Sequence, residues 1–86
     1  MDKKSSKILN EAILEVVENQ LRAGNPPETK KTFERLLKEG LDEQEAKRLI
    51  GCVVAGEIFD VLKQQQPYNH ERFIKALNQL PELPWE

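Results

Sequence analysis

The chain has 86 residues, of which 33% are charged, and a formal net charge of −2, so one small domain is expected and a polyanion-binding surface is not. Its single cysteine, Cys52, cannot form a disulfide within the chain, its N-terminal MDKKSSK leads into a segment too polar for a signal peptide, and no apolar run approaches the ~18 residues of a membrane span. We therefore expect a cytoplasmic protein that binds neither nucleic acid nor membrane.

The first predicted helix starts at a cap provided by Ser5 or Ser6 and reaches about residue 23, and residues 1–5 are expected to be frayed. Gly24 follows where a left-handed residue commonly ends a helix. Gln20 interrupts the apolar stripe of this helix, since it falls at about 20° from Leu9 on a helical wheel. The stripe consists of Leu9, Ala12, Ile13, Val16 and Val17.

The segment NPPE at residues 25–28 predicts the start of a second helix, with Asn25 as the cap, Pro26 at the first helical position and Glu28 as the capping-box acid. This helix is expected to run to residue 39 and to end at Gly40, with Leu41 making the usual hydrophobic contact after the glycine. Its predicted buried residues are Phe33, Leu36 and Leu37.

The longest predicted helix covers residues 42–64, begins at the cap Asp42, and is the element that the other helices must cover. Its apolar stripe consists of Ala46, Leu49, Ile50, Val53, Val54 and Val61. Glu57 falls inside this stripe, where an unpaired charge costs several kcal/mol, so we expect it to be hydrogen-bonded, shifted in pKa or reached by water. One hypothesis is that Gln20 and Glu57 meet across the core. The alternative is that both long side chains reach water.

Pro67 predicts the end of the central helix and Asn69 the cap of a fourth helix. The predicted buried residues of this fourth helix are Phe73, Ile74, Leu77 and Leu80. Prolines hold residues 81–86 extended, and Trp85 either folds back over an open end of the core or serves as a binding anchor. Four helices without strand-like alternation predict one all-α domain over residues 1–86, either a compact four-helix bundle or an orthogonal helical array.

The sequence runs VENQ, NPPET, RLL followed by EG, and EA resemble a bacterial family of small helical domains of unknown function. Some members of that family are joined to a Cys-rich SEC-C metal-binding motif. The resemblance covers roughly residues 9–81 and implies a helical fold with no established reaction. Members carry histidine pairs four residues apart at two places, where this chain has Asn10 with Leu14 and Gln44 with Arg48. Because leucine and arginine do not ligate zinc or iron, the resemblance implies that any such metal site is lost here.

No arrangement of residues in the sequence predicts catalysis. His70 has no second histidine or cysteine near it and is expected to be a solvated residue at a helix start, and Cys52 is expected to be a small buried hydrophobe. Glu11, Glu15 and Glu18 share one side of the first helix and could hold a hard cation, although such a run is usually a solvated face. We therefore expect no enzyme activity, no bound metal and no cofactor.

The corner between the second and third helices allows two further interpretations. It superficially matches a helix-turn-helix, but a recognition helix beginning DEQE would aim three carboxylates at DNA, which argues against this reading. The run LLKEGLDEQEAKRLI is also similar to the helix-corner-helix of ubiquitin-associated domains, although it lacks the usual aromatic residue in the loop. This second similarity is local, and it implies a protein-interaction surface.

The expected function is that of a protein-interaction or adaptor module, which acts on a larger partner or as a homodimer. The candidate interaction surface comprises Cys52, Ile58, Phe59, Leu62 and Trp85. If the fourth helix covers the first four of these residues, no patch remains; if it does not, the exposed apolar area marks an interface. The competing class is a degenerate metal-binding domain or an accessory domain of an enzyme system.

Overall fold

A computed structural model describes the backbone of residues 3–83 and the side chains of residues 11–83. Within this part of the chain there are four helices and no strand: α1 (Lys3–Ala23), α2 (Pro27–Lys38), α3 (Glu43–Gln64) and α4 (His70–Gln79). The predicted all-α fold is therefore confirmed. Among the described residues, no helix has both the length and the apolar character needed to cross a membrane.

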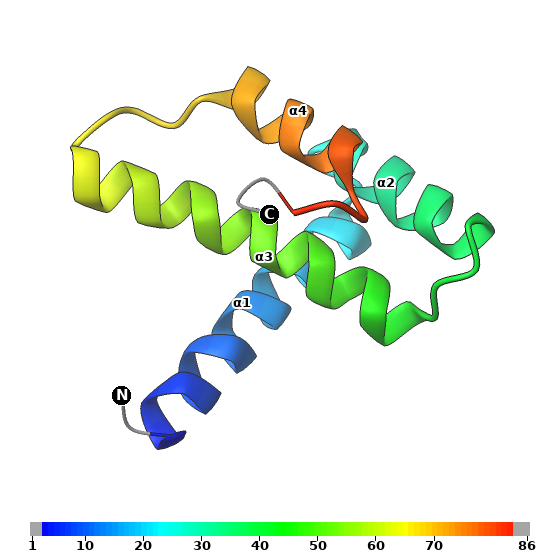
Figure 1. Cartoon of the computed structure of the whole chain (residues 1–86), viewed down its shortest axis with the longest axis horizontal. Coiled ribbons are helices and arrows are strands. Elements are labelled where there is room, and N and C mark those ends of the chain that lie inside the picture. Colours follow the sequence, from blue (N-terminus) through cyan, green and yellow to red (C-terminus); the bar gives the residue numbers. More distant parts are fainter. Residues whose placement is uncertain (1–2, 84–86) are drawn as a thin grey trace.

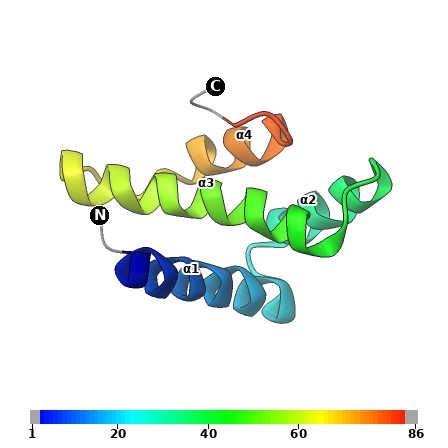
Figure 2. The same cartoon turned by 60° about the horizontal axis from the view of Figure 1, so that its bottom comes forward.

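The longest helix, α3, forms the centre of the molecule and contacts each of the other three helices (Figure 1). Helices α1 and α4 lie on opposite sides of α3, and α2 packs near the N-terminal half of α3 (Figure 2). Because α1 crosses α3 obliquely, the arrangement is an array of crossing helices and not a parallel bundle. The N-terminal half of α1 consequently points away from the body of the domain (Figure 1).

The hydrophobic core lies between the inner face of α3 and the three shorter helices. Its buried members are Val17, Leu36, Ala46, Leu49, Ile50, Val53, Val54, Phe73, Leu77 and Leu80. Helix α1 starts at Lys3, so the predicted cap at Ser5 or Ser6 and the predicted frayed segment up to residue 5 are wrong. The predicted stripe of α1 holds only in part, because Val17 is buried and Ile13 half-buried, whereas Ala12 and Val16 are exposed; the side chain of Leu9 lies outside the described residues. The oblique crossing explains this difference, since only residues near the crossing point meet α3. Gly51 allows the close approach, because a Cβ atom there would lie 3.2 Å from Ile13 Cγ2.

The predicted start of α2 is wrong by one residue, whereas the predicted start of α3 is confirmed. Helix α2 starts one residue later than predicted, with Pro26 and not Asn25 in the cap position and Pro27 at the first helical position. The reason is steric: Pro26 itself precedes a proline, and such a residue is forced into an extended conformation, here with φ −73° and ψ 149°. At the start of α3, Asp42 caps as predicted, and its Oδ1 accepts a hydrogen bond from the Glu45 N–H at 2.7 Å.

The corner between α2 and α3 is built as the sequence predicts. Gly40 has φ +101° and stops α2, the Gly40 N–H donates to the Leu37 carbonyl at 3.1 Å, and the Leu41 N–H donates to the Leu36 carbonyl at 3.1 Å. These two bonds satisfy carbonyl groups that the end of a helix leaves without an internal partner. Helix α3 then continues unbroken through both of its glycines.

Helix α3 ends at Gln64, before Pro67, because Gln65 adopts a left-handed conformation with φ 54°. Asn69 caps α4 as predicted, accepting a hydrogen bond from the Arg72 N–H at 3.0 Å. Residues 80–82 form a turn, held by a bond of 3.0 Å from the Glu82 N–H to the Gln79 carbonyl, so the prediction of an extended tail from residue 81 is wrong there. Trp85 lies outside the described residues.

The C-terminal end of α4 is held by an arginine from α2. Arg35 Nη2 donates to the Leu77 carbonyl and Arg35 Nη1 to the Leu80 carbonyl, both at 2.9 Å. A guanidinium at this position satisfies terminal carbonyl groups and faces the negative end of the helix dipole. Sequence reasoning missed this role, since 42 to 45 residues separate the partners.

Candidate functional site

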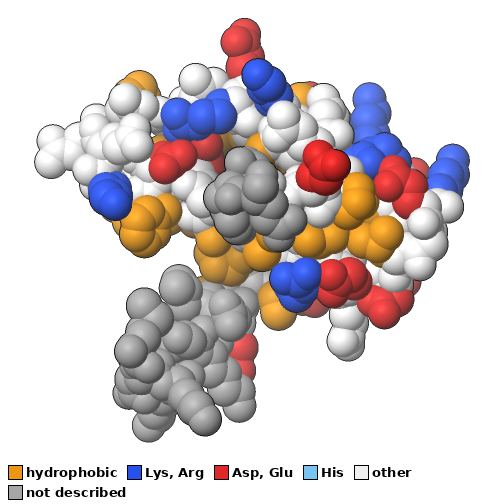
Figure 3. Space-filling view, viewed as in Figure 1, with side chains coloured by type: hydrophobic (Ala, Val, Ile, Leu, Met, Phe, Trp, Pro, Cys, Tyr) orange, Lys and Arg blue, Asp and Glu red, His pale blue; other side chains and the backbone are white. Residues whose placement is uncertain are grey.

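The outward side of the C-terminal half of α3 carries a continuous apolar ridge. It consists of Ala55, Ile58, Phe59 and Leu62, spaced at i, i+3, i+4 and i+7, and we name these four residues the outer seam. Ile58, Phe59 and Leu62 are 43%, 64% and 75% exposed. Hydrophobic side chains are visible along α3 in the space-filling view (Figure 3). The interpretation in which α4 covers these side chains is therefore wrong.

The C-terminal half of α3 is apolar on two sides, and the other helices leave the side that carries the seam uncovered. Its inner stripe, which includes Ile50, Val53 and Val54, faces the core, and the seam occupies the opposite side of the same helix. Helix α1 diverges from this end of α3, and α4 packs against the inner stripe through Phe73 and Leu77. A helix that is apolar on two sides is normally covered on both, and the seam is the apolar side of α3 that no described helix covers.

An open hollow of about 380 Å³ lies beside the seam, between α1 and α3. Its lining is mostly apolar and comprises Val16, Gln20, Val54, Glu57, Ile58, Val61, Leu62, Tyr68 and Phe73. A second hollow of about 320 Å³ lies toward α4 and is lined by Val53, Gly56, Glu57, Phe59, Asp60, Arg72 and Ala76. The seam is therefore a ridge with a hollow on each side. The residues of the predicted interaction surface therefore lie beside two different hollows. Ile58 and Leu62 line the first hollow, and Phe59 lines the second.

The remaining residues of the predicted surface contribute less. Cys52 is half-buried on the flank of α3, and Trp85 is not among the described residues. Lys63 stands beside the seam with its Nζ 5.8 Å from the centre of the Phe59 ring, close enough for a cation–π contact. Among the described residues of the predicted surface, the side chains that are exposed are consequently Ile58, Phe59 and Leu62.

Glu57 is buried, as its place in the inner stripe predicts, and its charge is fully paired. Arg72 donates to both carboxylate oxygens, with Nη2–Oε1 at 2.8 Å and Nε–Oε2 at 3.0 Å, and the Asn69 N–H donates to Oε1 at 3.1 Å. The hydrogen bonds from Arg72 lower the pKa of Glu57, although burial opposes this, and the same pair raises the pKa of Arg72. The Glu57 carboxylate is therefore ionised near neutral pH. In this state it links α3 to α4 and has no proton to donate.

Gln20 and Glu57 line the same hollow, but they do not bond to each other in the structure. Gln20 Oε1 accepts a hydrogen bond of 2.9 Å from the hydroxyl of Thr29, a buried residue at the start of α2. The hypothesis that Gln20 and Glu57 pair across the core is therefore wrong. Each of these two side chains bonds to a helix other than the predicted one. Gln20 joins α1 to α2, and Glu57 joins α3 to α4.

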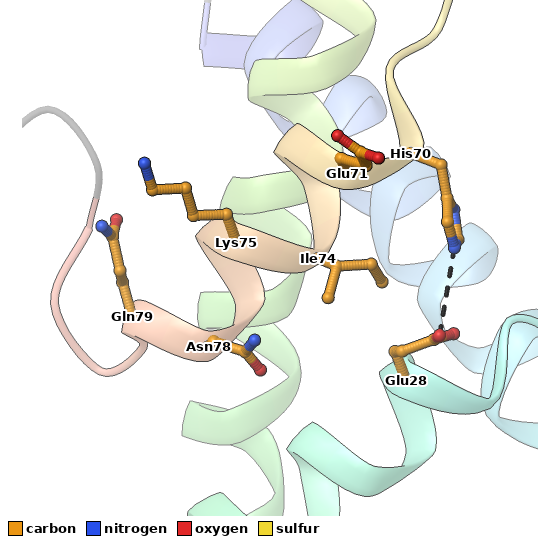
Figure 4. A pocket seen from close by; sticks show the side chains of 7 residues that line it. All are labelled: Glu28, His70, Glu71, Ile74, Lys75, Asn78 and Gln79. Carbon is orange, nitrogen blue, oxygen red and sulfur yellow. Dashed lines mark ion pairs between the residues drawn. The ribbon is translucent and has the colours of Figure 1, made fainter.

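A third hollow, of about 430 Å³, lies between the start of α2 and one face of α4 (Figure 4). In it His70 Nε2 lies 3.9 Å from Glu28 Oε2, and the Tyr68 hydroxyl lies 3.1 Å from His70 Nδ1. The pKa of Tyr68 is raised by burial and by the charges of Glu57 and Glu28. His70 is exposed, as predicted, and Glu28 is the carboxylate that lies at ion-pair distance from it.

The acidic run on α1 gives no evidence of a cation site. Glu11, Glu15 and Glu18 are exposed, and Glu18 pairs with Lys47 of α3 at 3.6 Å. Among the residues that the structure describes, no group of three or more His, Cys, Asp or Glu side chains is placed to hold a metal ion.

Comparison of the chain with protein-family models, curated proteins and solved structures found no match. The resemblance to a bacterial family of helical domains stays a prediction from the sequence.

Proposed function

We propose that this protein is a protein-interaction module without catalysis, and that it binds its partner through the outer seam. The observation that supports this most is the exposure of Ile58, Phe59 and Leu62 side by side on a helix whose other side is well packed. Burying such apolar side chains in an interface removes them from water, which stabilises a complex.

The arrangement of the fold also supports a binding role. The side chains of Gln20 and Glu57 are both hydrogen-bonded within the domain, and these bonds fix the helices that carry the seam. The hollow beside α4, in contrast, is lined mainly by exposed side chains and contains no serine, threonine or cysteine (Figure 4). The seam is therefore the better candidate.

An affinity-capture experiment tests the proposal. The tagged protein is incubated with lysate of its own host, cross-linked, and the bound proteins, copies of the chain itself included, are identified by mass spectrometry. We expect the double variant Phe59→Ser/Leu62→Ser to lose the specific partner. The control Lys31→Gln, on an exposed residue of α2, should retain it. Equal capture by the double variant and the wild type would overturn the proposal.

A further inference from the structure

We infer that the partner of the outer seam is the same seam of a second copy of the chain, so that the protein forms a two-fold symmetric dimer. This inference rests on the proposed function and names the partner for that same surface. A two-fold interface uses one patch on both subunits, and it therefore requires a patch that is complementary to itself.

The shape of the surface meets this requirement. The seam is a ridge formed by Phe59, Leu62 and their neighbours, and the hollows of about 380 Å³ and 320 Å³ lie on its two sides. Packing of helices places the ridge of one helix into the groove beside the ridge of the other. Because each copy carries both a ridge and its flanking hollows, two copies can interdigitate.

The seam supplies a large part of the area that a dimer needs. With Ile58, Phe59 and Leu62 exposed to 43%, 64% and 75%, the seam presents on the order of 350 Å² of apolar side-chain surface per copy. Two copies face to face would bury on the order of 700 Å² from these side chains alone, more than half of the roughly 1,200 Å² at which stable specific interfaces begin. The rim adds further area from partly exposed neighbours such as Val16 and Tyr68.

The charges around the seam do not oppose its pairing with a copy. The seam itself contains no charged residue, and the charged residues that line its hollows or contact Phe59 include two of each sign: Glu57 and Asp60, and Lys63 and Arg72. A second copy therefore does not bring a surface of one sign against another of the same sign, which would cost binding free energy.

Sedimentation equilibrium of the purified chain tests the inference. We expect the wild type to be dimeric at micromolar concentration and the Leu62→Glu variant to have a dimer dissociation constant at least ~10-fold higher, because the carboxylate would be buried in the interface. The control Lys31→Gln changes the net charge by the same amount on an exposed residue of α2, and its dissociation constant should equal that of the wild type.

Cross-linking gives a second measurement, which detects the contact between the two seams directly. In a Cys52→Ala background, a cysteine introduced by Phe59→Cys at the middle of the seam lies near its counterpart in a two-fold dimer, so oxidation should yield a covalent dimer. The matched variant Lys31→Cys should stay monomeric under the same conditions.

The outcomes separate this inference from the proposed function. A wild type that is monomeric up to millimolar concentration, without a Phe59→Cys cross-link, would overturn the dimer. If Phe59→Ser/Leu62→Ser then still loses a different protein in affinity capture, the proposed binding role of the seam stands. If neither dimerisation nor capture depends on the seam, both proposals fail.

Discussion

Glu57 is a charged residue at a core position of α3, and its partners explain how the core accommodates it. A buried carboxylate is costly unless each oxygen finds a donor. Arg72 supplies a two-pronged contact and the Asn69 backbone supplies a third hydrogen bond. The residue therefore fixes the position of the first turn of α4 on α3.

Replacing Glu57 by glutamine should destabilise the fold. The amide keeps the shape of the side chain, but it loses the charge-assisted bonds to Arg72, and its NH₂ group cannot accept from that guanidinium. We expect the free energy of unfolding, measured in urea, to fall by about 1–3 kcal/mol. Asp60→Asn is the control, because Asp60 lies 4.0 Å from Arg72 and is only partly buried. Its effect should stay within about 0.5 kcal/mol.

The same ion pair predicts a dependence of stability on pH. Because the pKa of Glu57 is lower in the folded protein than in the unfolded chain, the pair contributes fully above the ordinary value of 4.5. This contribution is lost as the pH falls through the pKa of the folded state. The difference in unfolding free energy between wild type and Glu57→Gln should thus be constant from pH 7 to 5 and shrink below about 4.5. A difference that stays unchanged down to pH 3 would contradict the assignment.

Helix ends in this protein are set mainly by residues within one turn of the end. The stop at Gly40, the cap at Asp42 and the cap at Asn69 all use partners at most five residues away. Local sequence was therefore sufficient to predict them. The start of α2 lies one residue later than the capping pattern predicts, because Pro27 restricts Pro26 to an extended conformation.

The variant Gly40→Ala tests the end of α2. With φ +101°, an alanine there would adopt a conformation that side chains with a Cβ atom disfavour, and we expect a loss of about 1–2 kcal/mol in unfolding free energy. The control Lys38→Ala, in the last turn of α2, keeps helical geometry on an exposed position and should change stability by less than about 0.5 kcal/mol. Similar stabilities for the two variants would show that the corner does not require the glycine.

The start of α4 can be tested through its cap. Asn69→Ala removes the acceptor for the Arg72 N–H, and the unfolding free energy should fall by about 1 kcal/mol. Asn69→Ser restores a capping oxygen and should recover most of this loss in the same denaturation experiment. The backbone bond from Asn69 to Glu57 is present in both variants, so the comparison isolates the side-chain cap.

The exposure of the seam follows from the way the whole domain is assembled. Helix α1 meets α3 closely at Gly51 and then diverges, and α4 occupies only the inner side of α3. The three shorter helices thus leave the outer seam of α3 uncovered, although these residues are apolar. The remaining side is available to a partner.

A dimer formed through the seam should make thermal stability depend on concentration. Because association stabilises only the folded state, the Tm of the wild type should rise by about 3–5 °C for each tenfold increase in protein concentration. Differential scanning calorimetry across a hundredfold range measures this directly. Leu62→Glu should show a weaker dependence of Tm on concentration, and an equally strong dependence in both proteins would rule out the seam as the contact.

The sequence by itself determined the four helices, most of their ends, the inner stripe of α3 and the anomaly at Glu57. These features depend on periodicity, capping residues and proline or glycine stereochemistry, all of which act within a few positions along the chain. Only the tertiary structure decided that Glu57 pairs with Arg72, that Gln20 bonds to Thr29, and that α4 leaves Ile58, Phe59 and Leu62 exposed. The physical reason is that partners and coverage depend on the angle at which helices cross, and a periodic pattern fixes which face is apolar but not which neighbour will cover it.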